Sequence, residues 1–100
     1  MNGQSPLEEA FEQFHAGLRY LVMYNGPLEE RLSQAWLCHL TRVRERDLAD
    51  PALADRIAAV KKRCAEVDDL HETEQGALAA EILAIYTAIS EQLTLVSSPH

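Results

Sequence analysis

Apolar side chains recur along this chain at spacings of three and four residues, the period of an α-helix with one buried face. Four segments show this pattern, and none alternates apolar and polar residues as a half-buried strand does. The pattern therefore predicts an all-α protein. The apolar positions of the four expected helices are, in chain order, Leu7, Phe11, Phe14, Leu18 and Leu21; Leu28, Leu32, Ala35, Trp36, His39 and Val43; Leu53, Ile57, Val60, Cys64 and Val67; and Leu78, Ile82, Ile85, Ile89, Leu93 and Val96.

Local sequence signals bound the first three of these helices. Residues 5–8, Ser-Pro-Leu-Glu, have the form of a capping box with proline at the first helical position, so a helix is expected to begin there. Residues 25–27, Asn-Gly-Pro, are expected to end it, because proline cannot continue a helix and glycine tolerates the left-handed geometry of a C-terminus. Pro27 can also open the second helix, and Asp50 with Pro51 repeats the cap-plus-proline signal before the third.

The junction between the third and fourth helices is open to two interpretations. Asp69 and Glu72 have the spacing of a capping box, which favours a new helix at this point. Residues 77–96 then contain neither proline nor glycine and are expected to be helical throughout. However, no proline or glycine interrupts residues 52–75 either, so a single fused rod is the alternative.

Short connections between these segments predict how they pack. Loops of two to four residues bring consecutive helices together in opposite directions, so we expect an up-down antiparallel bundle of four helices. One hundred residues are too few for two independent cores, and residues 1–100 are expected to form a single helical domain. The ends of the chain, residues 1–5 and 97–100, are expected to fray.

Composition and charge narrow the classes of function. The chain is 47% hydrophobic and 25% charged, which is typical of a folded globular protein. Its net charge of −7 argues against nucleic acid as a partner, because binding to phosphates depends on basic side chains. No run of eighteen apolar residues predicts a membrane span, and no secretion signal is recognised, so Cys38 and Cys64 are expected to be reduced thiols in the cytoplasm.

The acidic and basic residues are unevenly distributed. Residues 1–30 carry a net charge of −4, residues 31–63 carry +4, and residues 64–100 carry −7 with no basic residue. Neighbouring helices of opposite charge can pair within the chain. As an alternative, the acidic last third could cover the basic site of another protein, as an inhibitor or immunity-type protein does.

No set of residues predicts catalysis, a metal site or a cofactor. Glu12 and His15 match the Glu-x-x-His spacing of di-iron bundles, but a second such pair is missing, and we interpret them as surface residues. His39 lies on the apolar face of the second predicted helix, where a buried imidazole bonded to a backbone carbonyl or a carboxylate is expected. The alternative is a small enzyme or a metal-binding or ligand-binding bundle that uses His39.

The last predicted helix carries an unusual surplus of uncharged surface. Between residues 77 and 96 only Glu81 and Glu91 are charged, and a helix that is apolar or small-sided nearly all round is usually buried on more than one side. We therefore expect a homodimer formed through this helix, and a cytoplasmic binding protein without chemistry of its own, such as an adaptor, chaperone or regulator of an unidentified protein. The expected contact residues are Leu83, Thr87, Ser90 and Thr94, with Leu37 and Leu40 as further contacts.

Overall fold

The computed structural model describes residues 5–97, with side chains as far as Leu95, and all regular structure in that range is helical. This confirms the all-α class. Within the described residues there are four α-helices and three short 3₁₀ helices. Their bounds are α1 (Pro6–Met23), α2 (Leu28–Cys38), η1 (Leu40–Arg42), η2 (Glu45–Asp47), α3 (Pro51–Ala65), η3 (Val67–Asp69) and α4 (Glu72–Ser97).

The two predicted cap-plus-proline signals both begin helices. The Glu8 N–H donates to Ser5 Oγ at 3.2 Å, and the Ser5 N–H donates to Glu8 Oε1 at 3.0 Å, so the capping box of α1 is confirmed. At α3, Asp50 Oδ1 accepts hydrogen bonds from the N–H groups of Ala52 and Leu53. Each signal satisfies N–H groups that a helix leaves without an internal partner.

The turn from α1 to α2 is held by one arginine. Gly26 has φ +150°, which glycine adopts readily, and Pro27 stands at the N-cap of α2. Arg31 reaches back from α2, where its Nη1 donates to the Leu21 carbonyl at 2.6 Å and its Nε donates to the Gly26 carbonyl at 3.1 Å. Arg31 therefore satisfies a carbonyl at the end of α1 and fixes the two helices to each other.

The second helix is shorter than the apolar pattern predicts. The expected helical face extends to Val43, but α2 ends at Cys38, and His39 breaks the helix with φ −135° and ψ −55°. The chain then continues through η1 and η2 to α3. Lys61 of α3 stabilises this path, because its Nζ donates to the Val43 carbonyl at 2.8 Å and to Glu45 Oε1 at 2.9 Å.

The third and fourth helices are separate, so the alternative of a fused rod is wrong. The 3₁₀ helix Val67–Asp69 and an extended Leu70 divide them. The expected capping box of Asp69 and Glu72 does not form, because Asp69 belongs to that 3₁₀ helix. Instead Glu74 Oε1 accepts the His71 N–H at 2.9 Å, two residues further along the chain.

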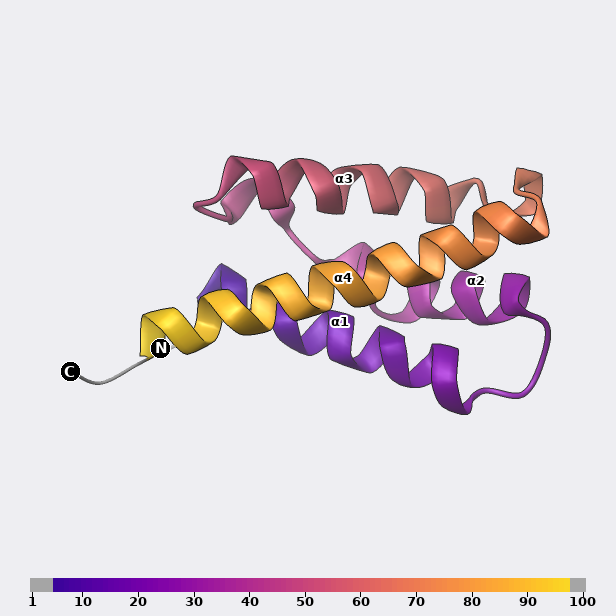
Figure 1. Ribbon diagram of the computed structural model, residues 1–100, viewed down its shortest axis with the longest axis horizontal. Coiled ribbons are helices and arrows are strands. Elements are labelled where there is room, and N and C mark those ends of the chain that lie inside the picture. Colours follow the sequence, from indigo (N-terminus) through magenta and orange to yellow (C-terminus); the bar gives the residue numbers. More distant parts are fainter. Residues whose placement is uncertain (1–4, 98–100) are drawn as a thin grey trace.

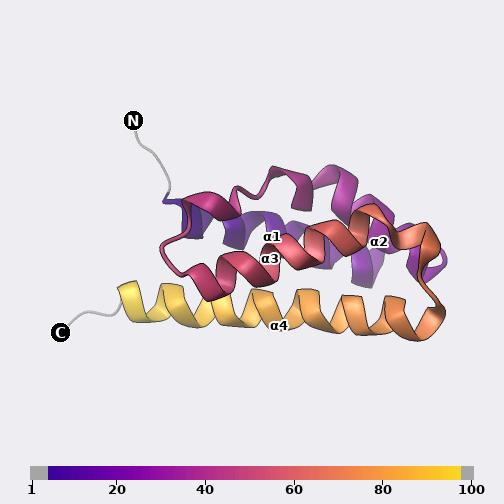
Figure 2. The ribbon, with the colours of Figure 1, turned by 90° about the horizontal axis from the view of Figure 1, so that it is seen from above.

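One apolar core joins the four helices, and α4 lies against both α1 and α3. Figure 2 shows α4 along one side of the molecule, with the other three helices on its opposite side. Its 26 residues span about 39 Å, close to the 45 Å long axis of the protein, and Figure 1 shows it running from end to end. The side chains predicted for its buried stripe, Leu78, Ile82, Ile85 and Ile89, are buried, as are Leu53, Ile57, Val60, Cys64 and Val67 of α3 and η3.

Some sequence predictions concern the ends of the chain. The side chain of Val96, expected in the stripe of the last helix, lies outside the described residues. The same holds for residues 1–4 and 98–100 of the ends that were expected to fray. Residue 5 is the cap of α1, and residue 97 is the last residue of α4.

Candidate functional site

The outer face of α4 is the part of that helix that points away from the other three. Leu83 keeps 53% of its surface exposed, Thr87 and Thr94 are exposed, and Ser90 is half-buried. These four residues therefore lie where the sequence placed them, at the surface. We use the name outer face of α4 for Ala80, Leu83, Ala84, Thr87, Ser90 and Thr94.

The threonines on this face are less polar than their composition indicates. The Thr87 hydroxyl donates to the Leu83 carbonyl at 3.0 Å, and the Thr94 hydroxyl donates to the Ser90 carbonyl at 3.0 Å. Each hydroxyl hydrogen is therefore bonded to the backbone one turn earlier in the same helix. The face therefore exposes mainly methyl groups and small apolar side chains, together with the carboxylate of Glu91.

Two polar side chains of the same helix lie at its edge with α3. Glu81 accepts two hydrogen bonds from Arg56, at 3.0 and 3.3 Å, and Gln92 donates to Asp50 Oδ2 at 2.8 Å. These bonds fix α4 against α3 and neutralise the charge of Glu81. Of the two charged residues that the sequence shows between positions 77 and 96, only Glu91 is left without such a bond to α3.

An apolar groove between α1 and α4 continues this surface. It has a volume of about 220 Å³ and is lined by His15, Leu18, Arg19, Val22, Met23 and Tyr86. Val22 and Met23 keep 80% and 68% of their surface exposed. The Tyr86 ring stacks on Phe11 of α1 with centroids 5.1 Å apart, and Leu83 precedes Tyr86 by one helical turn. The outer face of α4 is therefore flanked by exposed apolar side chains of α1.

The two leucines expected as further contacts have opposite surroundings. Leu37 of α2 is 61% exposed, so its predicted surface position is confirmed. The prediction for Leu40 is wrong, because Leu40 is fully buried and belongs to the core. The reason is the break at His39, which ends α2 and turns Leu40 inward toward Gly17 and Ala35.

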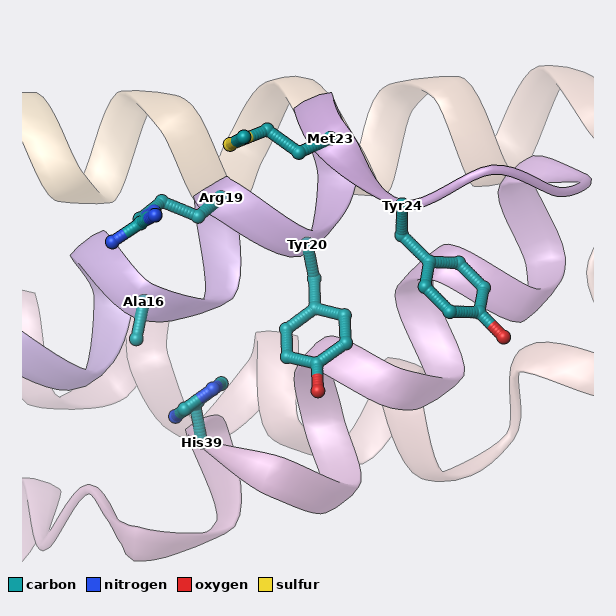
Figure 3. A pocket seen from close by; sticks show the side chains of 6 residues that line it. All are labelled: Ala16, Arg19, Tyr20, Met23, Tyr24 and His39. Carbon is teal, nitrogen blue, oxygen red and sulfur yellow. The ribbon is translucent and has the colours of Figure 1, made fainter.

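A second hollow, the aromatic pocket, lies where α1 meets the end of α2. Its volume is about 420 Å³, and it is lined by Ala16, Arg19, Tyr20, Met23, Tyr24 and His39. Figure 3 shows four of these side chains on α1 and that of Tyr24 directly after it, with His39 at the end of α2. The Tyr20 ring lies 5.8 Å from the Tyr24 ring and 5.5 Å from the His39 ring, measured between centroids. The three rings form one wall.

His39 and Tyr20 are both perturbed by their neighbours. Burial lowers the pKa of the His39 imidazole, and the positive charge of Arg42 lowers it further, so the neutral ring is favoured. The pKa of Tyr20 is raised, mainly by a hydrogen bond to the Cys38 side chain at the end of α2. His39 therefore lies on the wall of an open pocket and caps a helix, which differs from the predicted imidazole inside the helical core.

His15 and His71 have structural contacts. His15 is exposed and stacks on Phe11, with Tyr86 also beside it, at centroid distances of 6.3 and 6.0 Å. The backbone of His71 is capped by Glu74. Among the residues that the structure describes, no group of three or more His, Cys, Asp or Glu side chains could hold a metal ion.

Carboxylates gather at the end of the molecule where α2 and α4 begin. Glu29 of α2 faces Asp68 of η3, and a hydrogen bond between their side chains raises the pKa of Glu29. Figure 1 shows the starts of α2 and α4 at the end of the molecule where the chain passes from α3 to α4, and the segments at this end carry further acidic residues. The acidic members of this end are Glu29, Glu30, Glu66, Asp68, Asp69, Glu72 and Glu74.

The pattern of apolar residues along the sequence does not predict the aromatic pocket. Tyr20, Met23 and Tyr24 stand off the apolar stripe of the first helix, and scattered exposed apolar residues are ordinary on a protein surface. A usable signal was the spacing of Tyr20 and Tyr24, which places two rings one turn apart beside Arg19. His39 lines the pocket only because α2 ends before it, at Cys38.

Comparison with known proteins finds no match to a family model, a curated protein or a solved structure.

Proposed function

We propose that this chain is a cytoplasmic protein-interaction module, an up-down bundle of four helices that forms a homodimer through the outer face of α4. In this role it acts by docking, as an adaptor, chaperone or regulator does, and carries no chemistry of its own. The observation that supports the proposal is the long outer face of α4, which carries Glu91 as its one charged side chain and which no other element of the described structure covers.

The apolar content of α4 exceeds what its own bundle uses. Only 22% of the most apolar stretch of α4 is buried, although the helix supplies Ile82, Ile85 and Ile89 to the core. Leu83 and Leu95 remain 53% and 77% exposed on the other side. A helix in a monomeric bundle keeps a polar face toward water, so a helix that is apolar on both sides favours a second packing partner.

A stable dimer needs more surface than the outer face of α4 alone provides. The outer face runs from Ala80 to Thr94, about 21 Å of helix, and with a width of about 10 Å it offers each copy about 210 Å² of footprint. A standard interface buries about 800 Å² per partner, so α4 alone is too small. The groove with Val22, Met23 and Tyr86 lies beside it and supplies further apolar surface. A twofold axis would make each copy contribute the same two regions.

The same helix is long and apolar enough, by length and composition, to cross a membrane. Its contacts argue for a protein partner instead. Transfer of α4 into a bilayer would remove its isoleucines from the core and break the bonds of Glu81 to Arg56 and of Gln92 to Asp50. A core helix of a water-soluble protein therefore accounts better for α4 than a membrane span does.

Light scattering after size exclusion tests the dimer. We expect a mass twice the 11.2 kDa of one chain at high micromolar concentration, falling toward one chain on dilution. Leu83→Glu should shift the protein to the monomer, because a carboxylate would be buried without a partner. The control Ala58→Glu places the same charge on an exposed position of α3 and should leave the dimer intact.

Three results would contradict the proposal. A mass of 11.2 kDa at every concentration would exclude the dimer. Equal dissociation by Leu83→Glu and Ala58→Glu would show that charge alone, and not this face, controls association. Sedimentation of the folded protein with neutral phospholipid vesicles would assign the face to a membrane surface.

The acidic end supports a second candidate, an inhibitor or immunity-type protein that covers a basic site. The observation that favours it is the contact of Glu29 with Asp68, in which two carboxyl groups lie together although this weakens the ionised state. Charge of one sign concentrated at one end speeds encounter with an opposite surface. A basic protein that co-purifies from the host at low salt and dissociates at high salt would support this role. Loss of that binding in a Glu29→Lys variant would show that the acidic end makes the contact.

A further inference from the structure

We propose that the aromatic pocket binds a small planar aromatic carboxylate. The pocket lies outside the outer face of α4, although it shares Arg19 and Met23 with the groove beside that face. Its volume of about 420 Å³ lies within the roughly 300–1,000 Å³ of small-molecule sites. Its lining combines aromatic side chains with a few polar groups, which is the usual composition of such sites.

The wall of the pocket offers ring faces for stacking, and the rings are not coplanar, because Tyr20 is tilted by 46° to Tyr24 and by 49° to His39. Tyr20 stands between Tyr24 and His39, with ring centroids 5.8 and 5.5 Å away. The contacts of the Tyr20 ring with these two rings, and its proximity to Cys38 at the end of α2, limit its freedom. Little side-chain freedom is then lost when a flat ring packs against this wall, which favours binding.

The charge at the rim favours an anion. Figure 3 shows Arg19 and His39 on either side of Ala16, the small residue between them. Arg19 is exposed and forms no ion pair within the described part of the chain, so its guanidinium is available to a ligand. The charge of Arg42 also acts on His39, so the surroundings of that ring are positive.

The ligand class follows from combining the wall and the rim. A guanidinium binds a carboxylate through two parallel hydrogen bonds, while the adjacent rings pack on an aromatic group attached to it. Met23, which is 68% exposed beside Arg19, has a flexible thioether that can cover the ring from the open side. An aromatic carboxylate satisfies all three contacts, whereas an aliphatic carboxylate or a neutral ring satisfies fewer.

A pair of matched probes tests this assignment. 2-Naphthoate and naphthalene-2-carboxamide have nearly the same shape but differ in charge, and binding of each can be followed by the NMR signals of the Tyr20, Tyr24 and His39 rings. We expect saturable shifts with 2-naphthoate and roughly tenfold weaker binding of the carboxamide. Arg19→Gln should remove that preference, whereas Arg46→Gln, an exposed arginine that does not line the pocket, should keep it.

A further variant separates the wall from the rim. Tyr20→Leu should weaken both probes by about tenfold while the helical circular dichroism stays unchanged. Should this variant unfold, the surface substitution Arg19→Gln decides the question by itself. The proposal is overturned by unsaturable shifts at millimolar probe, by equal affinity for the two probes, or by shifts at residues outside the pocket.

Discussion

Leu40 packs directly on the backbone of Gly17: a methyl group added to Gly17 would lie 3.3 Å from Leu40 Cδ2. Glycine at this position of α1 allows the segment that follows α2 to approach the helix closely, and both residues are buried. The early end of α2 therefore has a structural role, because it brings a leucine that a longer helix would have left outside into contact with α1.

This contact predicts different outcomes for two leucines that lie three positions apart. Leu40→Ala should lower the free energy of unfolding by about 2–5 kcal/mol, because it opens a cavity in the core. The matched variant Leu37→Ala, at a residue that is 61% exposed, should change it by no more than about 0.5 kcal/mol. Urea unfolding measures both values. Similar effects of the two substitutions would place Leu40 at the surface, as the apolar pattern alone suggested.

The two free thiols should react at very different rates. Burial raises the pKa of the Cys64 thiol to about 12, and Cys64 is buried in the core, whereas Cys38 is half-buried at the end of α2. The thiolate is the reactive form. We expect one thiol per chain to react fast with an aromatic disulfide reagent at pH 8, and both thiols to react after denaturation. The Cys38→Ser variant should lose the fast reaction, and a fast phase that persists in it would contradict the assignment.

Acidification should destabilise the protein through His39. Its pKa is lowered in the folded state by burial and by Arg42, so the unfolded chain binds a proton more readily. Above the pKa of the unfolded state, about 6.5, the ring is neutral in both states and does not affect the free energy of unfolding. As the pH falls from there through the lower pKa of the folded state, the unfolded chain gains a proton more readily, and the free energy of unfolding falls. Thermal melts between about pH 7 and pH 5 should show a shallower loss of Tm in His39→Gln than in the unchanged protein. Arg42→Gln should give an intermediate slope, and identical slopes in all three would exclude this origin.

Removal of one carboxylate at the acidic end should stabilise the fold. The pKa of Glu29 is raised by its hydrogen bond with Asp68, so its ionised form is disfavoured in the folded state. This cost is present at neutral pH and disappears once the pH falls below the unfolded pKa of about 4.3. Glu29→Gln should therefore raise Tm at pH 7 but not at pH 3.5 or so. The neighbouring change Glu30→Gln should have a smaller effect, and a lower Tm for Glu29→Gln would show that the carboxylate is stabilising.

The parts of the fold that the sequence predicted correctly depend on neighbouring residues. Ser5 with Glu8, and Asp50 with the two N–H groups after Pro51, make hydrogen bonds within three positions of the chain, so the residue types alone carry the information. The buried stripe of α3 is equally local, because the helical period assigns a face to each residue. The exposure of Leu83 and Thr87 follows from the same period.

The parts that the sequence missed depend on contacts between distant segments. No proline or glycine marks the end of α2 at Cys38, and the helical pattern continues to Val43. The break places Leu40 against Gly17 and the Val43 carbonyl against Lys61, contacts that join residues 18 or more positions apart. Their free energy outweighs the weak preference of a few residues for the helical state. The aromatic pocket has the same origin, because His39 meets Tyr20 only after α2 has ended.

The sequence by itself therefore determined the four helices, the starts of the first three and the largely uncharged face of the last one, because these follow from a fixed period and from hydrogen bonds between near neighbours. The tertiary structure decided which of Leu37 and Leu40 is buried, where α2 stops and which side chains meet at the aromatic pocket. Those outcomes depend on how α1, α2 and α3 pack together, and packing depends on shapes and distances that residue order along one helix does not encode.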